Sequence, residues 1–335
     1  MAADTPGSEQ KLSWGILSTA RIAGEVMPGL QRSARNTVRA VASRDPGRAA
    51  AFAREYGLPV AYASYEELLA DPGIDCLYIC LPNSLHEHWT RAALEAGKHV
   101  LCEKPLTPTE EQARGLHELA VRRGLVLAEA FMYRHHPKAK KLRDLVASGA
   151  LGGIRTIRCS FNFMVGDPAA DIRYDLGLAG GSLLDVGSYC VSLANYVQDE
   201  QPAEVSGIAK HAQSGVAEQF YGILTFRSGA VAIFDCAMNA PLSIRASVLG
   251  SAGEAVIEVP WYPHLPPTTI DVRYADGRSE QIDASGENAY FLETEDFAAV
   301  VRGEKSPEVA PAETLRNLRT LGRLASSAEQ HGAGR

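Results

Sequence analysis

The chain has 335 residues, of which 46% are hydrophobic and 22% charged, and its formal net charge is -7. These values fit a globular protein with enough chain for two domains of ordinary size, and they exclude the fibrous, the disordered and the strongly basic nucleic-acid-binding classes. No run approaches the roughly 20 apolar residues that span a bilayer, so no membrane association is expected.

Residues 11–130 alternate short apolar runs with amphipathic stretches. This pattern predicts strands at Leu12–Leu17, Val38–Ser43, Ile74–Leu81 and 99–102, with helices starting at Arg21, Pro46 and Ser84. The run Ile74–Leu81 is almost wholly apolar, which is typical of a parallel strand buried on both faces. We therefore expect a doubly wound α/β domain over residues 11–130.

Two helix starts in this region carry capping signals. Ser64 is followed three residues later by Glu67, and Thr107 by Glu110, so both pairs fit a capping box. Pro108 then stands at the first helical position, where its missing N–H costs nothing.

From about Gly153 the hydrophobic period changes to two. Ile157, Cys159, Phe161 and Phe163 can share one face of a half-exposed strand. Further strands are predicted at 220–226, 230–236, 244–249, 255–259 and 270–274, and helices at 287–302 and 311–325. This pattern therefore predicts an α+β domain with an open, mixed sheet over residues 131–330.

The turn after the first strand has a degenerate glycine pattern. In the segment Gly15–Ala23, Ser18 and Ala20 stand where two glycines of a GxGxxA turn would be expected. Both residues are small enough to let backbone N–H groups approach a pyrophosphate at a helix N-terminus, although an ordinary strand-to-helix turn is an equal reading of this motif alone. The expected cofactor contacts here are Ser18, Thr19, Ala20, Arg21 and Ile22.

The end of the second strand selects between the two nicotinamide cofactors. Where an NAD-binding domain would place an acid for the ribose 2′-OH, this chain has Ser43 and Arg44. A guanidinium offers a permanently charged fork for a 2′-phosphate, which favours NADP(H), with NAD(H) still possible. Asp45 and Pro46 can start the next helix without conflict with this role.

Two further motifs carry a specific resemblance. Residues 102–106 read CEKPL, residues 180–189 read GGSLLDVGSY, and Leu81, Pro82 and Asn83 are followed by His86. With these motifs in order, the chain resembles the glucose–fructose oxidoreductase, inositol dehydrogenase and rhizopine catabolism protein (Gfo/Idh/MocA) family over nearly all residues after the first ten. The resemblance implies an N-terminal Rossmann domain, a C-terminal α+β domain with an open, mainly antiparallel sheet, and a homodimer or homotetramer built on that sheet.

One departure narrows the substrate class. Many relatives have His four residues after the motif's Asp, whereas this chain has Tyr189. It therefore resembles the tyrosine branch, which includes glucose–fructose oxidoreductase, dimeric dihydrodiol dehydrogenase, xylose dehydrogenase and deoxysugar ketoreductases. The implied substrate is a sugar or sugar-like alcohol or ketone, with a trans-dihydrodiol or xylose as alternatives.

The residues themselves suggest how such a reaction would proceed. Hydride transfer to a ketone requires a proton for the developing alkoxide, and Tyr189 can supply it. A free phenol has a pKa of about 10, which a neighbouring Lys104 ammonium would lower. Asp185, one helical turn before Tyr189, can orient Lys104 or a substrate hydroxyl, or can simply cap its helix. These three are the predicted catalytic residues.

Other residues near these motifs complete the predicted site. Asn83 and His86 are expected to line the cofactor cleft, although His86 can equally start a helix. Arg173 is expected to bind substrate hydroxyls or a phosphate, with a surface salt bridge as the plain alternative. The predicted cofactor set is completed by Leu81, Pro82, Glu103 and Lys104, and the predicted substrate set is Lys104, Arg173, Asp185 and Tyr189.

Other features indicate the expected compartment and limit the classes of function. The first residues lack an export signal, and six scattered cysteines lack CxxC spacing, so a cytoplasmic protein with reduced cysteines and no metal site is expected. The pair His135 and His136 is predicted to be structural, because adjacent helical residues point to different faces. A non-catalytic NADP-sensing regulator is an alternative of another class, but it would need neither Lys104 nor Tyr189.

Overall fold

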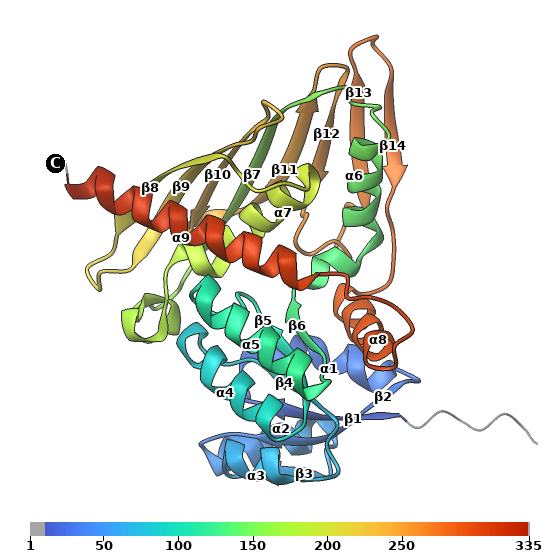
Figure 1. Ribbon diagram of the computed structural model, residues 1–335, viewed down its shortest axis with the longest axis vertical. Helices are drawn as coiled ribbons and strands as arrows, with labels where there is room; N and C mark the ends of the chain where they lie inside the picture. The colour runs from blue at the N-terminus through green and yellow to red at the C-terminus, as the bar shows by residue number, and fades with distance from the viewer. Residues whose placement is uncertain (1–10, 334–335) are drawn as a thin grey trace, which may run out of the picture.

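The computed structural model describes residues 11–333 and contains two sheets, one in each half of the chain (Figure 1). The first sheet has six parallel strands in the order β3-β2-β1-β4-β5-β6. Its strands are β1 (Leu12–Leu17), β2 (Asn36–Ala42), β3 (Val60–Tyr62), β4 (Cys76–Ile79), β5 (His99–Glu103) and β6 (Leu127–Ala130). Its helices are α1 (Arg21–Arg32), α2 (Pro46–Tyr56), α3 (Tyr65–Ala70), α4 (Asn83–Glu95) and α5 (Glu110–Arg123).

The strand order of this sheet defines where a ligand can bind. The order reverses between β1 and β4, and every residue of β4 is buried, as its apolar run predicted. In doubly wound sheets, ligands bind outside the carboxyl ends of the strands at such a reversal. The chain leaves β1, β4 and β5 there at Leu17, Ile79 and Glu103.

The two predicted capping signals have different outcomes. Ser64 accepts a hydrogen bond from the N–H of Glu67 and caps α3, as predicted. The prediction for Thr107 was wrong, because α5 begins two residues later and Thr109 is its N-cap. The Thr107 hydroxyl instead donates to the carbonyl oxygen of Thr109 at 2.7 Å, which holds Pro108 in the turn before the helix.

The second sheet has eight strands in the order β14-β13-β12-β11-β7-β10-β9-β8, and all pairs except β10 with β7 are antiparallel. The predicted alternation is present in β7, where Ile157, Cys159 and Phe161 are buried. The strands are β7 (Ile154–Met164), β8 (Glu204–His211), β9 (Ala217–Thr225), β10 (Val231–Ala237), β11 (Asn239–Gly250), β12 (Gly253–Glu258), β13 (Thr269–Tyr274) and β14 (Ser279–Asp283).

Helices cover one face of the second sheet and leave the other face open (Figure 1). The covering helices are α6 (Pro137–Ala147), α7 (Ser188–Gln198) and α9 (Pro311–Ala333). Short helical turns precede them, namely η1 (Met132–His135), η2 (Ile172–Tyr174), η3 (Leu176–Leu178) and η4 (Leu183–Gly187).

Helix α8 (Ala289–Val301) follows the second sheet in the chain but packs on the first half. The rings of Phe297 and Trp14 lie 5.1 Å apart, and a Cβ on Gly29 would meet the backbone of Phe291 at 2.9 Å. Glycine at position 29 therefore lets α1 and α8 approach closely. The boundary at residue 130 stays a prediction.

Two expectations about the whole chain can be compared with the structure. One segment, Leu176–Gln198, does have the length and hydropathy of a membrane span, contrary to the sequence expectation, but 61% of its window is buried inside the protein. Its last 11 residues form α7, which packs in the core. All six cysteines are free and buried. Residues 1–10, on which the expectation about export rests, lie outside the described residues.

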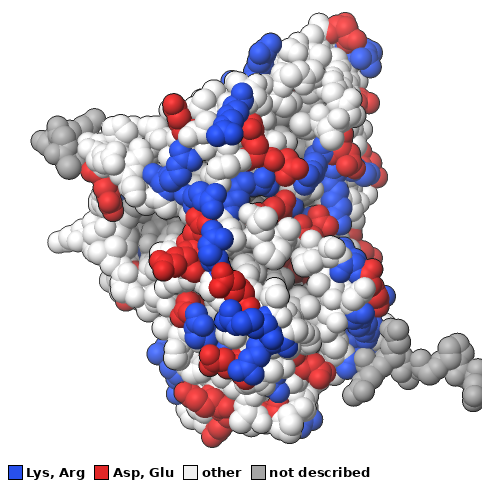
Figure 2. Space-filling model, viewed as in Figure 1, with Lys and Arg blue, Asp and Glu red and all other residues white. Residues whose placement is uncertain are grey.

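Basic and acidic side chains are interspersed across the face shown in Figure 2. This distribution is typical of a solvated surface.

Candidate active site

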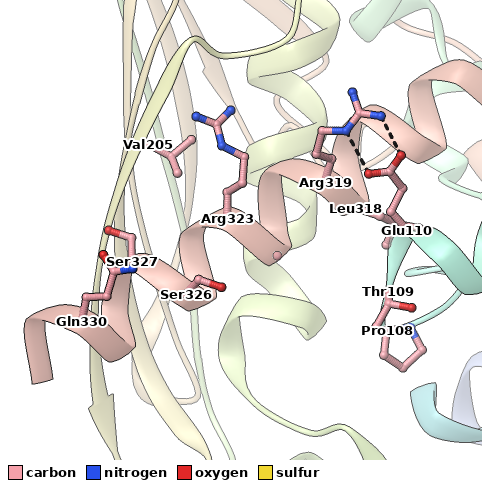
Figure 3. Close-up of a pocket in the computed structure, with 11 residues that line it drawn as sticks. Pro108, Thr109, Glu110, Val205, Leu318, Arg319, Arg323, Ser326, Ser327 and Gln330 are labelled. Carbon is pink, nitrogen blue, oxygen red and sulfur yellow. Dashed lines mark hydrogen bonds and ion pairs between the residues drawn. The ribbon is translucent and has the colours of Figure 1, made fainter. Parts of the chain in front are cut away.

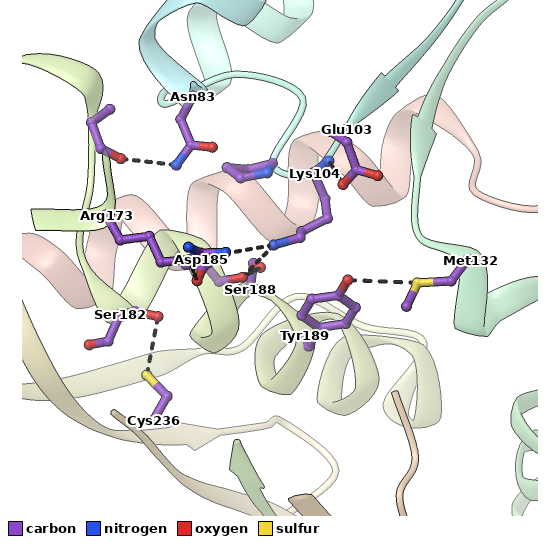
Figure 4. A network of polar contacts seen from close by, with 12 residues as sticks. Asn83, Glu103, Lys104, Met132, Arg173, Ser182, Asp185, Ser188, Tyr189 and Cys236 are labelled. Atoms are coloured by element: carbon purple, nitrogen blue, oxygen red, sulfur yellow. Dashed lines mark hydrogen bonds and ion pairs between the residues drawn. The ribbon is translucent and has the colours of Figure 1, made fainter. Parts of the chain in front are cut away.

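Lys104 and Asp185 meet between the two sheets (Figure 4). Lys104 directly follows β5, and its Nζ atom donates to the main-chain oxygen of Asp185 at 2.7 Å and to Oδ1 at 3.1 Å. Asp185 lies in η4, a π-helical turn that runs directly into α7. Such turns are rare and occur often at functional sites.

Arg173 extends this contact into a chain of alternating charges. Its Nε atom donates to Asp185 Oδ2 at 2.7 Å, and its Nη1 atom contacts both carboxylate oxygens of Asp171 at 3.1 and 3.2 Å. Gly180 makes room for this arrangement, because a Cβ there would collide with the carbonyl oxygen of Arg173. Three of the four predicted substrate residues, Lys104, Asp185 and Arg173, are therefore brought together, and Asp171 is an unpredicted fourth member of the chain of charges.

The electrostatics of Asp185 follow from its two cations. Burial alone would raise the pKa of its carboxyl group, but Lys104 and Arg173 outweigh burial and hold that pKa below its usual value. Asp185 is therefore ionised at neutral pH. It can orient Lys104 and accept a hydrogen bond from a substrate hydroxyl.

Tyr189, the second residue of α7, lies beside Lys104 but in a different relation from the predicted one. Its side chain is 7% exposed, and Lys104 Nζ lies 4.9 Å from the centre of its ring. Its hydroxyl contacts the Met132 sulfur at 3.7 Å. Burial, and then the Glu103 carboxylate, raise the pKa of Tyr189 well above 10. The expected lowering is wrong for this state, because the ammonium faces the ring and is held by Asp185.

The glycine-like turn has the predicted shape. Ser18 has a φ of 106°, a backbone conformation that favours glycine. This agrees with the alignment of Ser18 on a glycine of the GxGxxA turn. Ala20 is the N-cap of α1, and its methyl group cannot cap the N–H groups of the first turn, which starts at Arg21 and Ile22. These donors fit a pyrophosphate at the helix N-terminus. Thr19 contributes its carbonyl oxygen, which Arg48 approaches at 3.5 Å.

The end of β2 offers a fitting site for a further phosphate. The Arg44 side chain is exposed, and both it and Ser18 lie close enough to the Tyr65 hydroxyl to lower its pKa against the larger opposing effect of burial. Ser43 is buried, and its hydroxyl accepts from the Asp45 N–H at 3.2 Å, while Asp45 caps α2 as expected. Asp45, the acid that follows the strand, therefore binds the first turn of α2. Neither Tyr65 nor Arg48 was predicted, because each lies on a different element from Arg44.

The loop after β4 supports the cleft from the other side. Leu81 and Pro82 precede α4, which begins at Asn83, and the Asn83 side chain donates to the Ala179 carbonyl oxygen at 2.9 Å. Glu103 accepts hydrogen bonds from the Tyr78 hydroxyl and the Lys104 N–H. Burial raises the pKa of Glu103 above its usual value.

The prediction that His86 lines the cleft requires correction. Its side chain is fully buried, and its two ring nitrogens lie 2.8 Å from the carbonyl oxygens of Pro105 and Leu81. His86 therefore links the loops after β4 and β5 from inside the protein, where it is shielded from a ligand in the cleft. His86 lies in the first turn of α4, the alternative that the sequence left open, and its spacing from the neighbouring motifs suits either orientation.

A shallow groove between α9, β8 and the start of α5 lies apart from these residues (Figure 3). Its arginines are already engaged, Arg319 with Glu110 and Arg323 with the carbonyl oxygens of Pro202 and Ala203. We assign this groove no ligand.

Comparison with known proteins agrees with the fold. Residues 12–131 match the family model described as oxidoreductase family, NAD-binding Rossmann fold, and residues 139–256 match the GFO/IDH/MocA C-terminal domain. The chain is 38% identical over 326 residues to D-xylose 1-dehydrogenase (NADP(+)) 2 of Haloferax volcanii, covering 96% of this chain and 99% of the relative.

Two further relatives have different substrates in their names. Trans-1,2-dihydrobenzene-1,2-diol dehydrogenase of Sus scrofa is 36% identical over 257 residues, which cover 75% of this chain and 76% of the relative. A crystal structure of KijD10, a 3-ketoreductase from Actinomadura kijaniata in complex with NADP and TDP-benzene, superposes with a TM-score of 0.87 at 29% identity. This match covers 95% of this chain and 98% of the other.

Proposed function

This chain belongs to the GFO/IDH/MocA oxidoreductase family, and we propose that it transfers a hydride between NADP(H) and a sugar or sugar-like alcohol or ketone. Tyr189 is the proposed proton donor and acceptor, and Lys104 assists it. The observation that carries this proposal is the Lys104 ammonium, held by Asp185 at 2.7 Å and facing the Tyr189 ring at the carboxyl edge of the first sheet.

The proposed chemistry divides between cofactor and protein. NADP(H), when bound, supplies or accepts the hydride. Asp185 and Arg173 present an acceptor and a donor suited to hydroxyl groups of a polyol. Lys104 offers ammonium protons to the reacting oxygen, where they stabilise negative charge. Tyr189 is protonated at neutral pH and can give its proton in the direction of reduction, although burial, which raises its pKa, makes it a weaker acid than a free phenol.

The proposed preference for NADP(H) rests on the end of β2. The exposed Arg44 guanidinium, near Tyr65, provides a positive site for a 2′-phosphate, whereas Asp45 is turned into the cap of α2. The NADP named for two of the relatives supports the same preference. NAD(H) remains a second cofactor to test.

Xylose-type oxidation and trans-dihydrodiol oxidation are the two narrower alternatives. Each is the named activity of a relative that covers at least three quarters of this chain. A non-catalytic sensor is disfavoured because a sensor has no need for a lysine, Lys104, that contacts both Asp185 and the Tyr189 ring.

We further propose a cytoplasmic homodimer or homotetramer. Four large apolar side chains on β8, β9 and β10 are 40–53% exposed, a pattern that suits a subunit interface. They are Ile208, Tyr221, Ile223 and Ile233. Six free, buried cysteines suit a reducing compartment.

Turnover of NADPH and NADH with keto-sugars, and of NADP⁺ and NAD⁺ with aldoses and trans-diols, tests the function. Tyr189→Phe should lower kcat by roughly 10²–10⁴-fold, the usual contribution of general acid catalysis, without changing NADPH affinity. Tight NADPH binding without turnover on the whole panel would favour the sensor instead.

A further inference from the structure

Helix α9 has polar side chains on its buried face. Thr314, Asn317 and Thr320 are each at most 3% exposed, and their spacing of three places them along one side of the helix. Such a face is normally apolar, since a buried polar group is costly unless it is hydrogen-bonded. The partners of these side chains should therefore indicate what the strip is for.

The first partner reaches the loop that carries Lys104. The Thr314 hydroxyl donates to Glu129 Oε2 at 2.7 Å, and Glu129 Oε1 accepts the Leu106 N–H at 2.9 Å. Glu129 lies on β6 and is 2% exposed. Leu106 is two residues after Lys104, so this carboxyl group joins the Lys104 loop to the start of α9.

The second partner reaches the helix that carries Tyr189. Asn195, which lies on α7 and is 1% exposed, donates from its side chain to Asn317 Oδ1 at 2.9 Å. It also reaches the Thr320 hydroxyl at 3.4 Å. On the buried face of α9, Thr314 therefore contacts Glu129 below the Lys104 loop. Asn317 and Thr320 contact α7.

We propose that Glu129, Thr314 and Asn317 form a buried polar bracket that holds the Lys104 loop in register with α7, and that they are positioning residues for the reaction. This inference rests on the proposed function. Lys104 comes from the first sheet and Tyr189 from a helix on the second, so their 4.9 Å approach depends on how the two parts dock. Directional hydrogen bonds specify such a docking more narrowly than apolar contacts do.

The bracket tolerates either protonation state of Glu129. Burial raises the pKa of Glu129 to about 7, against the opposing influence of Thr314, Leu106, Lys104 and Arg134. The Thr314 hydroxyl can donate to the carboxylate or accept from the carboxylic acid. A glutamine can make the same two contacts, so Glu129→Gln should preserve the bracket and Glu129→Leu should break it.

The test compares these two variants and Thr314→Val with a matched control in the full-length protein. Thr294→Val is that control, because Thr294 is equally buried but its hydroxyl bonds within its own helix, to the Phe291 carbonyl oxygen at 3.0 Å. We would measure kcat, the NADPH dissociation constant, the thermal midpoint and the primary isotope effect with deuterated NADPH. A rise in the isotope effect would report slower hydride transfer.

Displacement of reacting groups by about 1 Å can cost on the order of 100-fold, so Glu129→Leu should lower kcat by about that factor and Thr314→Val by about 10-fold. NADPH affinity should stay within about twofold, and Glu129→Gln and Thr294→Val should keep kcat within about threefold. Unchanged kcat in Glu129→Leu and Thr314→Val, or an equal loss in Glu129→Gln, would overturn the proposal.

Crystal structures separate this inference from the proposed function. If the wild-type protein showed no turnover, the proposed function would fail, but the position of Lys104 Nζ relative to the Asp185 carbonyl oxygen could still be compared between wild type and Glu129→Leu. A separation well beyond the present 2.7 Å would support the bracket, and an unchanged separation would overturn it.

Discussion

Replacing Asp185 with Asn should destabilise the protein, because this carboxylate is shared by two cations. It receives Lys104 at 3.1 Å and Arg173 at 2.7 Å, and the side chains of these cations are 11% and 34% exposed. Loss of one partner of a buried pair costs about 3–5 kcal/mol, but Arg173 is partly solvated and keeps Asp171, so we expect about 2–3 kcal/mol.

The pH dependence of this loss has a definite sign. The pKa of Asp185 is lowered in the folded protein, whereas that of an Asp in an unfolded chain is about 3.9. The carboxylate therefore contributes stability that is fully present above about pH 4 and is lost as the pH falls through the lower folded value. The difference between wild type and Asp185→Asn should be constant from pH 5 to 7 and should shrink below about pH 4.

Urea denaturation at pH 7, 5 and 3.5 would measure this difference. Asp171→Asn is the matched control, since it removes a carboxylate from the more solvated side of Arg173 and should cost no more than about 1 kcal/mol. Equal stabilities of wild type and Asp185→Asn at pH 7, or a difference that persists unchanged at pH 3.5, would refute the shared-carboxylate argument.

Three further outcomes are expected. Arg44→Ala should raise the KM for NADPH by roughly 10–100-fold and leave that for NADH nearly unchanged, because only the former carries a 2′-phosphate; equal effects would contradict the assignment. Ser18→Gly should leave the free energy of unfolding in urea unchanged or raise it by about 1 kcal/mol by relieving a φ of 106°, and a clear loss would show that the backbone there is unstrained. Glu293 is 1% exposed, with a pKa raised well above 4.5, so its ionisation opposes folding as the pH rises above that value. Glu293→Gln should therefore stabilise the protein more at pH 8 than at pH 5. Urea denaturation of wild type and variant at both pH values measures this difference, and a larger gain at pH 5 would contradict the prediction.

Much of the fold could be predicted from local patterns. The apolar run of β4, the alternation in β7 and the start of α1 follow from burial periods, and the start of α2 follows from its capping residue Asp45. Strands β8 and β14 were missed because their exposed, polar positions at the two edges of the second sheet obscure the alternation. The start of α5 was misplaced because Thr107 and Thr109 present the same local chemistry.

The candidate site was only partly predictable. The order of Lys104, Asp185 and Tyr189 in recognisable motifs identified the residues, and the structure brings all three together. Asp171 and Tyr65 were missed, although Asp171 lies only two residues before Arg173. Their importance depends on contacts across separate elements, which no short pattern contains.

The sequence by itself determined the strand and helix periods, the small residues of the cofactor turn and the acid, lysine and tyrosine available for chemistry, because these depend on residue type and spacing along the chain. Only the tertiary structure decided the directions in which the polar groups point. It turned His86 behind the cleft, set the Lys104 ammonium over the Tyr189 ring and joined Glu129 to α9. Burial and the docking of segments far apart in the chain govern these outcomes, and both are properties of the packed molecule.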